Sequence, residues 1–114
     1  MTLQEIIDEL NLVRLTDEKN FNEIVPTKGY TSDLLSCVMA GASHQSLWIT
    51  LQAHSNIIAV AALLDLSAII ITEGAQPDNI TIAKANEQNV TLLSTPANTF
   101  TVVGKLWELG LGGE

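Results

Sequence analysis

Polar residues that could bind a small molecule gather in three short segments, each directly after an apolar stretch of the chain. These segments are residues 50–55, 72–78 and 94–99. Together they supply hydroxyl, amide, imidazole and carboxylate groups, which can donate and accept hydrogen bonds to a bound metabolite. The candidate ligand-binding residues that we select from them are Thr50, His54, Ser55, Thr72, Glu73, Gly74 and Asp78.

The central segment has the clearest pattern. Residues 68–71, AIII, form a β-branched apolar run typical of a strand buried on both faces. Residues 72–74 end that run, and Pro77 followed by Asp78 is typical of a helix start. Ligands bind at such junctions in parallel sheets because backbone donors point outward there. The alternative interpretation is that Gly74 only allows the chain to turn and that the polar residues face water.

The residues that could perform catalysis do not form a recognisable set. The chain has no P-loop, no GxGxxG and no GxSxG sequence. His44 and His54 stand in different loops without metal-ligand spacing, and the single Cys37 has an apolar helical context typical of a core thiol. Glu73 could act as an acid or base, accept a hydrogen bond from a ribose hydroxyl, or simply face solvent. We therefore predict a protein that is not an enzyme and has no metal or cofactor.

The charge balance and hydrophobic content argue against several classes of protein. The 114 residues include 13 acidic and 5 basic side chains, and the net charge of −8 disfavours a nucleic acid partner. The 46% hydrophobic fraction fits one globular domain over residues 1–114. No apolar run approaches the roughly 20 residues of a membrane helix. The N-terminal ten residues are acidic, unlike a signal peptide, so we expect a cytoplasmic protein that binds no membrane.

Apolar spacing and capping residues predict an α/β fold. The sheet is expected to be mostly parallel with helices on both faces, because strands and helices alternate through the second half of the chain. All strands of that half then end on one side of the sheet and bring the three polar segments together. The expected strands are 46–50, 68–71 and 90–94, and the expected helices are 2–10, 34–41, 56–65, 78–88 and 99–109.

Several local features are less regular. Residues 12–15 are interpreted as a short strand or packed coil, 24–26 as an extended segment and 28–30 as a turn. Residues 31–33 and Ser55 are interpreted as helix caps. The residues expected to point inward from the last two helices are Ile80, Ile82, Ala83 and Ala85, then Phe100, Val103, Leu106 and Trp107.

The helix expected at 56–65 has almost no polar face. Residues 57–64 read IIAVAALL, and a helix that is apolar all round must be covered on more than one side. One small chain supplies such cover with difficulty, so we predict that this helix, or an element beside it, packs in a homodimer interface. The alternative is a central helix wrapped by the N-terminal segment.

Four stretches of the chain resemble the DRTGG domain family. They are residues 29–36 (GYTSDLLS), 46–50 (SLWIT), 68–78 and 98–100. The resemblance covers most of the chain and implies an α/β domain similar in fold to the N-terminal domain of HPr kinase/phosphorylase, often dimeric and regulatory. The family's Thr-Gly-Gly corresponds to residues 72–74, where Glu replaces the middle glycine. Its Asp-Arg falls near residues 54–55, where no arginine is available to bind a phosphate.

These observations lead to two functional hypotheses. The first is a non-catalytic regulatory or ligand-sensing module, homodimeric, that binds a small metabolite or nucleotide where the parallel strands end. The alternative is a protein-interaction subunit without a small ligand, whose apolar helix docks on a partner enzyme.

Overall fold

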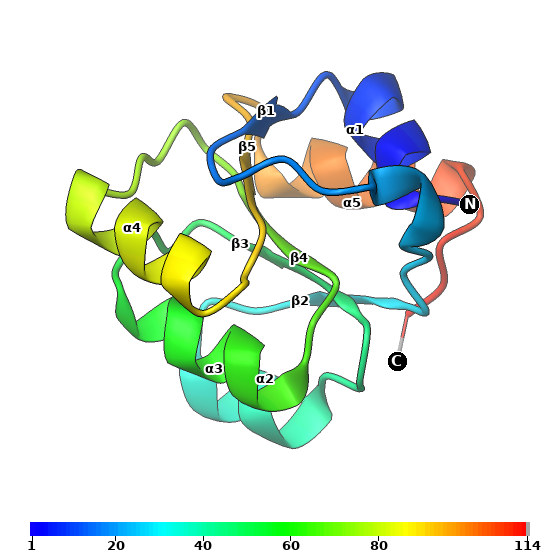
Figure 1. Cartoon of the computed structure of the whole chain (residues 1–114). Coiled ribbons are helices and arrows are strands. Elements are labelled where there is room, and N and C mark those ends of the chain that lie inside the picture. The colour runs from blue at the N-terminus through cyan, green and yellow to red at the C-terminus, as the bar shows by residue number, and fades with distance from the viewer. Residues whose placement is uncertain (114) are drawn as a thin grey trace.

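The computed structural model describes residues 1–113 and contains one sheet with helices on both faces (Figure 1). The elements in chain order are α1 (Leu3–Leu10), β1 (Val13–Arg14), the 3₁₀ helix η1 (Phe21–Glu23), β2 (Gly29–Thr31), α2 (Leu35–Gly41), β3 (Leu47–Thr50), α3 (Asn56–Leu64), β4 (Ala68–Ile71), α4 (Asn79–Glu87), β5 (Leu92–Ser94) and α5 (Thr99–Glu108). The predicted mostly parallel α/β fold is confirmed.

The strands lie in the order β1-β5-β4-β3-β2. β2, β3, β4 and β5 are parallel to one another, and only β1 runs antiparallel to its neighbour. The expected short strand at 12–15 is therefore β1, at the border of the sheet. We call the side on which the four parallel strands finish the carboxyl end of the sheet, and the opposite side the amino end.

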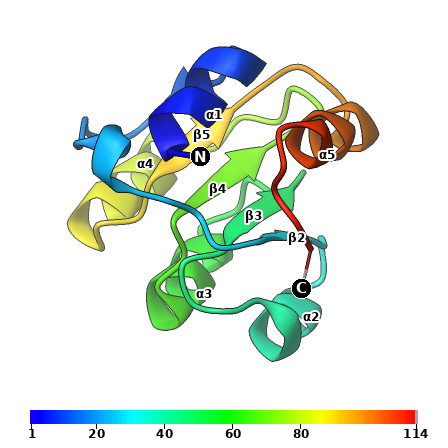
Figure 2. The same ribbon diagram turned by 90° about the vertical axis from the view of Figure 1, so that its right-hand side faces the viewer.

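Alternate side chains of the central strands enter two separate cores. Ile49, Ile70 and Leu93 pack against α1 and α5. Trp48 and Ile69, which point the other way, pack against α2, α3 and α4. Figures 1 and 2 show these two helix layers on opposite sides of the sheet. Every residue of β3, β4 and β5 is buried, as expected of parallel strands covered on both faces.

The N-terminal segment does not wrap helix α3. α1 lies on the opposite face of the sheet, and α3 packs between α2 and α4 instead. Residues Ile57, Ile58, Val60 and Ala61 of α3 are buried. The alternative in which the N-terminal segment covers this helix is therefore wrong.

Side-chain caps form at α1, α4 and α5, whereas the caps predicted at 31–33 and at Ser55 do not form. The N-cap position of α2 is Leu34, which makes no side-chain hydrogen bond. Thr2 and Glu5 form a capping box at α1. Asp78 and Asn98 accept hydrogen bonds from the third residues of α4 and α5. Ser55 precedes α3 but its side chain makes no capping hydrogen bond, because its own backbone is already helical.

The predicted turn at 28–30 is wrong, because residues 29–31 form strand β2. The Leu47 N–H donates to the Lys28 carbonyl at 2.8 Å, and the chain runs parallel to β3 from there. The extended segment expected at 24–26 belongs to no strand and follows η1. Pairing with a distant strand thus overrides the turn signal of a local Lys-Gly pair.

The faces predicted for α4 and α5 are partly wrong. Ile80 and Phe100 are 77% and 89% exposed, and Trp107 is 69% exposed. The residues that α5 buries most deeply are Val102 and Leu106. Of the set predicted for α4, Ala85 is buried and Ala83 is exposed. Two overlapping apolar stripes run along α5. The stripe with Val102 and Leu106 faces the sheet, whereas Phe100 and Trp107 face outward.

Cys37 is exposed rather than a core thiol. α2 covers the border strand β2 and buries a single residue, Val38. Cys37, which precedes Val38 in the sequence, therefore points outward. None of the helices over residues 1–113 is long and apolar enough to cross a membrane.

We predict that Trp48→Ala lowers the free energy of unfolding by about 3–5 kcal/mol. Trp48 is fully buried in the core beneath α2, α3 and α4, and its indole N–H donates to the Ser32 carbonyl at 2.9 Å. Urea denaturation followed by circular dichroism measures the loss. Trp107→Ala is the matched control and should change stability by less than about 0.5 kcal/mol, because Trp107 is exposed. Equal losses in both variants would contradict the assignment of the core.

Candidate functional site

The three polar segments lie side by side at the carboxyl end of the sheet. The Thr72 N–H donates to the Thr50 carbonyl at 2.9 Å, and the Thr95 N–H donates to the Ile71 carbonyl at 3.0 Å. These bonds continue the parallel ladder of β3, β4 and β5 into the turns that follow. The convergence expected from the order of strands and helices is present, whereas ligand binding by these residues stays a prediction.

The hydroxyls of Thr50 and Thr72 are turned into the protein. Both residues are fully buried. The Thr50 hydroxyl donates to an Asp33 carboxylate oxygen at 2.7 Å. The Thr72 hydroxyl lies 2.6 Å from that of Thr99 and 3.3 Å from the Thr50 carbonyl. The side chains of these two threonines therefore hold the turns together.

Asp33 belongs to the carboxyl end, although the sequence pattern indicated a helix cap. Its Oδ1 accepts hydrogen bonds from the Thr50 hydroxyl and from the Leu51 N–H, and its carbonyl accepts one from the Gln52 amide. It connects the turn after β2 to the turn after β3. Recognising β2 as a strand would have shown that a fourth strand–helix turn, with Asp33 in it, ends at this side of the sheet.

Glu73 and Gly74 both have left-handed backbone conformations, with φ of 63° and 73°. Their N–H groups donate to the carbonyls of Ala97 and Thr95. A Glu73 carboxylate oxygen accepts a hydrogen bond of 2.7 Å from the N–H of Thr99, the first residue of α5. Carboxylates are favoured at a helix N-terminus, so Glu73 fixes the start of α5 while its side chain stays exposed. Gly74 supplies the conformation that this tight turn needs.

Asp78, His54 and Ser55 lie where α4 and α3 begin. Asp78 accepts a 2.8 Å hydrogen bond from the Thr81 N–H. This backbone hydrogen bond is the main cause that lowers the pKa of Asp78 below its ordinary value, and His54 makes a smaller contribution. His54 is exposed, and its Nδ1 accepts from the Asn56 N–H at 3.3 Å. Ser55 is half-buried.

The surface of the carboxyl end is both acidic and apolar. Asp33, Glu73 and Asp78 are exposed there, and the turns at 31–34, 50–56, 72–80 and 94–100 contain no lysine or arginine. Each turn, or the helix start after it, also exposes one large apolar side chain: Leu34, Leu51, Ile80 and Phe100. The surface thus offers hydrogen-bond acceptors flanked by apolar groups.

Among the residues of these four turns, only Thr31 lines a cavity that we describe. One of about 60 Å³ is lined by Ile49, Val103, Leu106 and Leu111, between α5 and β2. Two others, of about 210 and 190 Å³, lie beside Lys105 and beside Trp107. A ligand at the carboxyl end would therefore rest on an open surface.

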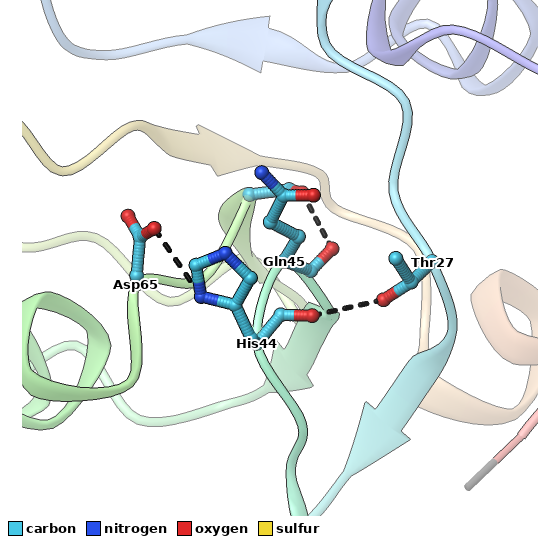
Figure 3. Close-up of polar contacts among 5 residues, drawn as sticks. Thr27, His44, Gln45 and Asp65 are labelled. Carbon is cyan, nitrogen blue, oxygen red and sulfur yellow. Dashed lines mark hydrogen bonds and ion pairs between the residues drawn. The ribbon is translucent and has the colours of Figure 1, made fainter.

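The two histidines lie on opposite sides of the sheet. His44 is at the amino end, where its Nδ1 lies 3.3 Å from an Asp65 carboxylate oxygen and its carbonyl accepts from the Thr27 hydroxyl (Figure 3). His54 is at the carboxyl end. Over residues 1–113, no three His, Cys, Asp or Glu side chains are grouped so that they could hold a metal ion.

Comparison with known proteins identifies the family. The model of the DRTGG domain matches residues 27–109. The chain belongs to the DRTGG domain family. The resemblance noted from the sequence is therefore confirmed over most of the chain. No curated protein matches it.

A solved structure shares the fold of this DRTGG domain. It is the crystal structure of the CBS and DRTGG domains of the regulatory region of Clostridium perfringens pyrophosphatase, complexed with the activator diadenosine tetraphosphate. The TM-score is 0.70 at 24% sequence identity, which shows the fold alone. The similarity covers 90% of this chain and 44% of that one, so this chain spans less than half the length of its neighbour.

We predict that Thr72→Val lowers the free energy of unfolding by roughly 1–2 kcal/mol, because the buried hydroxyl pairs with Thr99 and the Thr50 carbonyl. Urea denaturation measures the loss. Thr101→Val is the matched control, since Thr101 is exposed on α5 and should change stability by less than about 0.5 kcal/mol. An unchanged stability in Thr72→Val would argue against the buried pair of hydroxyls.

We predict that Asp78→Ala destabilises the protein near neutral pH and much less in acid. Because the folded pKa of Asp78 is lowered, the ionised carboxylate stabilises the fold at neutral pH. This contribution is lost as the pH falls through the lowered pKa. Urea midpoints of wild type and variant, measured near pH 7 and near pH 2, should differ mainly at the higher pH.

Asp78→Asn is the control for this experiment, because an asparagine oxygen can still cap α4 without a charge. It should be less destabilised than Asp78→Ala near neutral pH. A difference between wild type and Asp78→Ala that grows in acid would contradict the role of the ionised carboxylate.

Proposed function

We propose that this DRTGG domain is a non-catalytic, homodimeric regulatory module whose carboxyl end binds a small metabolite or nucleotide. The observation that carries the proposal is the convergence of four strand–helix turns on one surface, which places Glu73, Asp78 and His54 among exposed apolar groups. Ligands of open parallel sheets bind at this end of the strands.

The structural neighbour supports a nucleotide as the ligand. The DRTGG domain of that protein is part of a regulatory region, and the complex contains diadenosine tetraphosphate as activator. Membership of the same family and the shared fold support a regulatory role for the present chain. The cytoplasmic location expected from the sequence stays part of this proposal.

The chemistry of the surface favours the nucleoside part of such a ligand. Carboxylates accept hydrogen bonds from ribose hydroxyls and from the amino group of a base. The apolar side chains of Ile80 and Phe100 could pack on the base, because both are largely exposed. The absence of lysine and arginine from the four turns means that phosphates meet negative charge there. We therefore expect phosphorylated ligands to bind better with Mg²⁺.

A second function is favoured by the openness of the same surface. Four exposed apolar side chains around acidic groups, without an enclosed cavity among those described, also suit a protein partner. In that case the chain would be an interaction subunit of a larger enzyme and would bind no small ligand.

Isothermal titration calorimetry with adenosine, ATP and diadenosine tetraphosphate, each with and without Mg²⁺, tests the proposal. At least one of these ligands should bind, and Phe100→Ala should weaken it about tenfold through lost contact with the base. Trp107→Ala, an exposed aromatic residue outside the four turns, should leave affinity unchanged.

Absence of binding by all three ligands would contradict the nucleotide proposal and favour the interaction subunit. If the wild type and Phe100→Ala bind the ligand equally well, the ligand binds at a site other than the carboxyl end.

A further inference from the structure

We propose that Glu73 sets the specificity of the carboxyl end by occupying the place where an anion would bind. Its carboxylate lies at the start of α5, so the surface accepts ligand groups that donate hydrogen bonds and excludes phosphate groups that carry no metal ion. This inference rests on the proposed function and names the residue that selects the class of ligand.

The contact between Glu73 and α5 is the first observation. The N–H groups in the first turn of a helix have no partner within the helix and attract anions. α5 has ten residues, and the N–H of Thr99, its first residue, donates to a Glu73 carboxylate oxygen at 2.7 Å. The Thr101 N–H donates to the Asn98 side chain at 2.8 Å. The Glu73 carboxylate therefore takes the position that an oxygen of a ligand phosphate would otherwise have.

The fold holds Glu73 in this position. Its own N–H donates to the Ala97 carbonyl at 2.9 Å, and the preceding Thr72 hydroxyl lies 2.6 Å from the Thr99 hydroxyl. Glu73 has a φ of 63°, a conformation that glycine adopts without strain and glutamate rarely adopts. The glutamate therefore contributes its carboxylate to this turn rather than a preferred backbone conformation.

The starts of α3 and α4, at the same end of the sheet, show a similar arrangement. In α3, the Asn56 N–H donates to His54 Nδ1 at 3.3 Å. In α4, the Thr81 N–H donates to an Asp78 carboxylate oxygen at 2.8 Å. Because the four turns contain no lysine or arginine, a phosphate would meet neither a fixed positive side chain nor these N–H groups.

Glu73 also offers an acceptor to a ligand. Its side chain is exposed, and no other hydrogen-bond donor within residues 1–113 contacts its carboxylate. The carboxylate can therefore accept a hydrogen bond from a ribose hydroxyl or an amino group while it keeps its bond to α5. Exclusion of phosphate and acceptance of a donor thus come from one side chain.

Titration with inorganic phosphate in the absence of Mg²⁺, followed by the amide resonances in NMR spectra, tests the inference. In the wild type, the Thr99 amide should not shift. Glu73→Gly, which suits the left-handed backbone, should bind phosphate about tenfold more tightly than the wild type, with the largest shift at Thr99. Circular dichroism must show that this variant is folded; otherwise Glu73→Ala, which also lacks the carboxylate, replaces it with the same expectation.

Two control variants separate the position of the carboxylate from its charge. Glu73→Gln keeps an oxygen that can accept from the Thr99 N–H, so it should gain much less phosphate affinity than Glu73→Gly. Glu18→Gly removes one negative charge from an exposed residue between β1 and η1 and should bind phosphate like the wild type.

Three results would overturn the inference. They are a Thr99 shift in the wild type equal to that in Glu73→Gly, no gain of phosphate binding in the folded variant, and an equal gain in Glu73→Gln or Glu18→Gly. The last result would attribute the effect to charge alone. Calorimetry with adenosine is a separate measurement, so absence of adenosine binding together with the expected phosphate results would count against the proposed function alone.

Discussion

The hydrogen-bonded parallel pairing of β3, β4 and β5 is the constraint on which the rest of the structure depends. All residues of these strands are buried, so both faces of the sheet must be covered by helices. Because the strands run in one direction, covering them forces each chain segment to cross back over the sheet before the next strand begins. The turns at the carboxyl end are assembled by this requirement. Burial of apolar side chains, rather than attraction among polar ones, brings Thr50, Thr72 and Thr95 together.

The central part of this fold could be predicted from the sequence, and its borders could not. The run at 68–71 and the caps at Asp78 and Asn98 are local signals, and the structure has the strand and the helices that they indicate. β2 has three residues and begins with glycine, so its identity as a strand depends on contact with β3, far along the chain. The sequence of α5 contains two apolar stripes at helical spacing, and only tertiary packing selects between them.

The candidate site, like the fold, could be predicted from the sequence only in part. The order of strands and helices predicts which residues follow a strand, and hence that three polar segments converge. It does not predict the direction of a side chain, and the hydroxyls of Thr50 and Thr72 point inward. The resemblance to the family matches Glu73 to the middle glycine of its signature, and in the structure the Glu73 carboxylate turns back to the first residue of α5. A residue selected as a ligand contact thus also has an internal role, which only the position of Thr99 reveals.

The borders of the sheet have a consequence for the behaviour of the protein at high concentration. An unpaired strand border is a template on which other chains can add and grow into fibres. Here the outermost strands have only two and three residues, and the carbonyl of Gly112 accepts from Gly29 along the outside of β2. The segment AIII of β4 has the β-branched, uncharged composition that polymerises when it is exposed. Its central place, with a strand on each side, keeps this segment out of reach of other molecules.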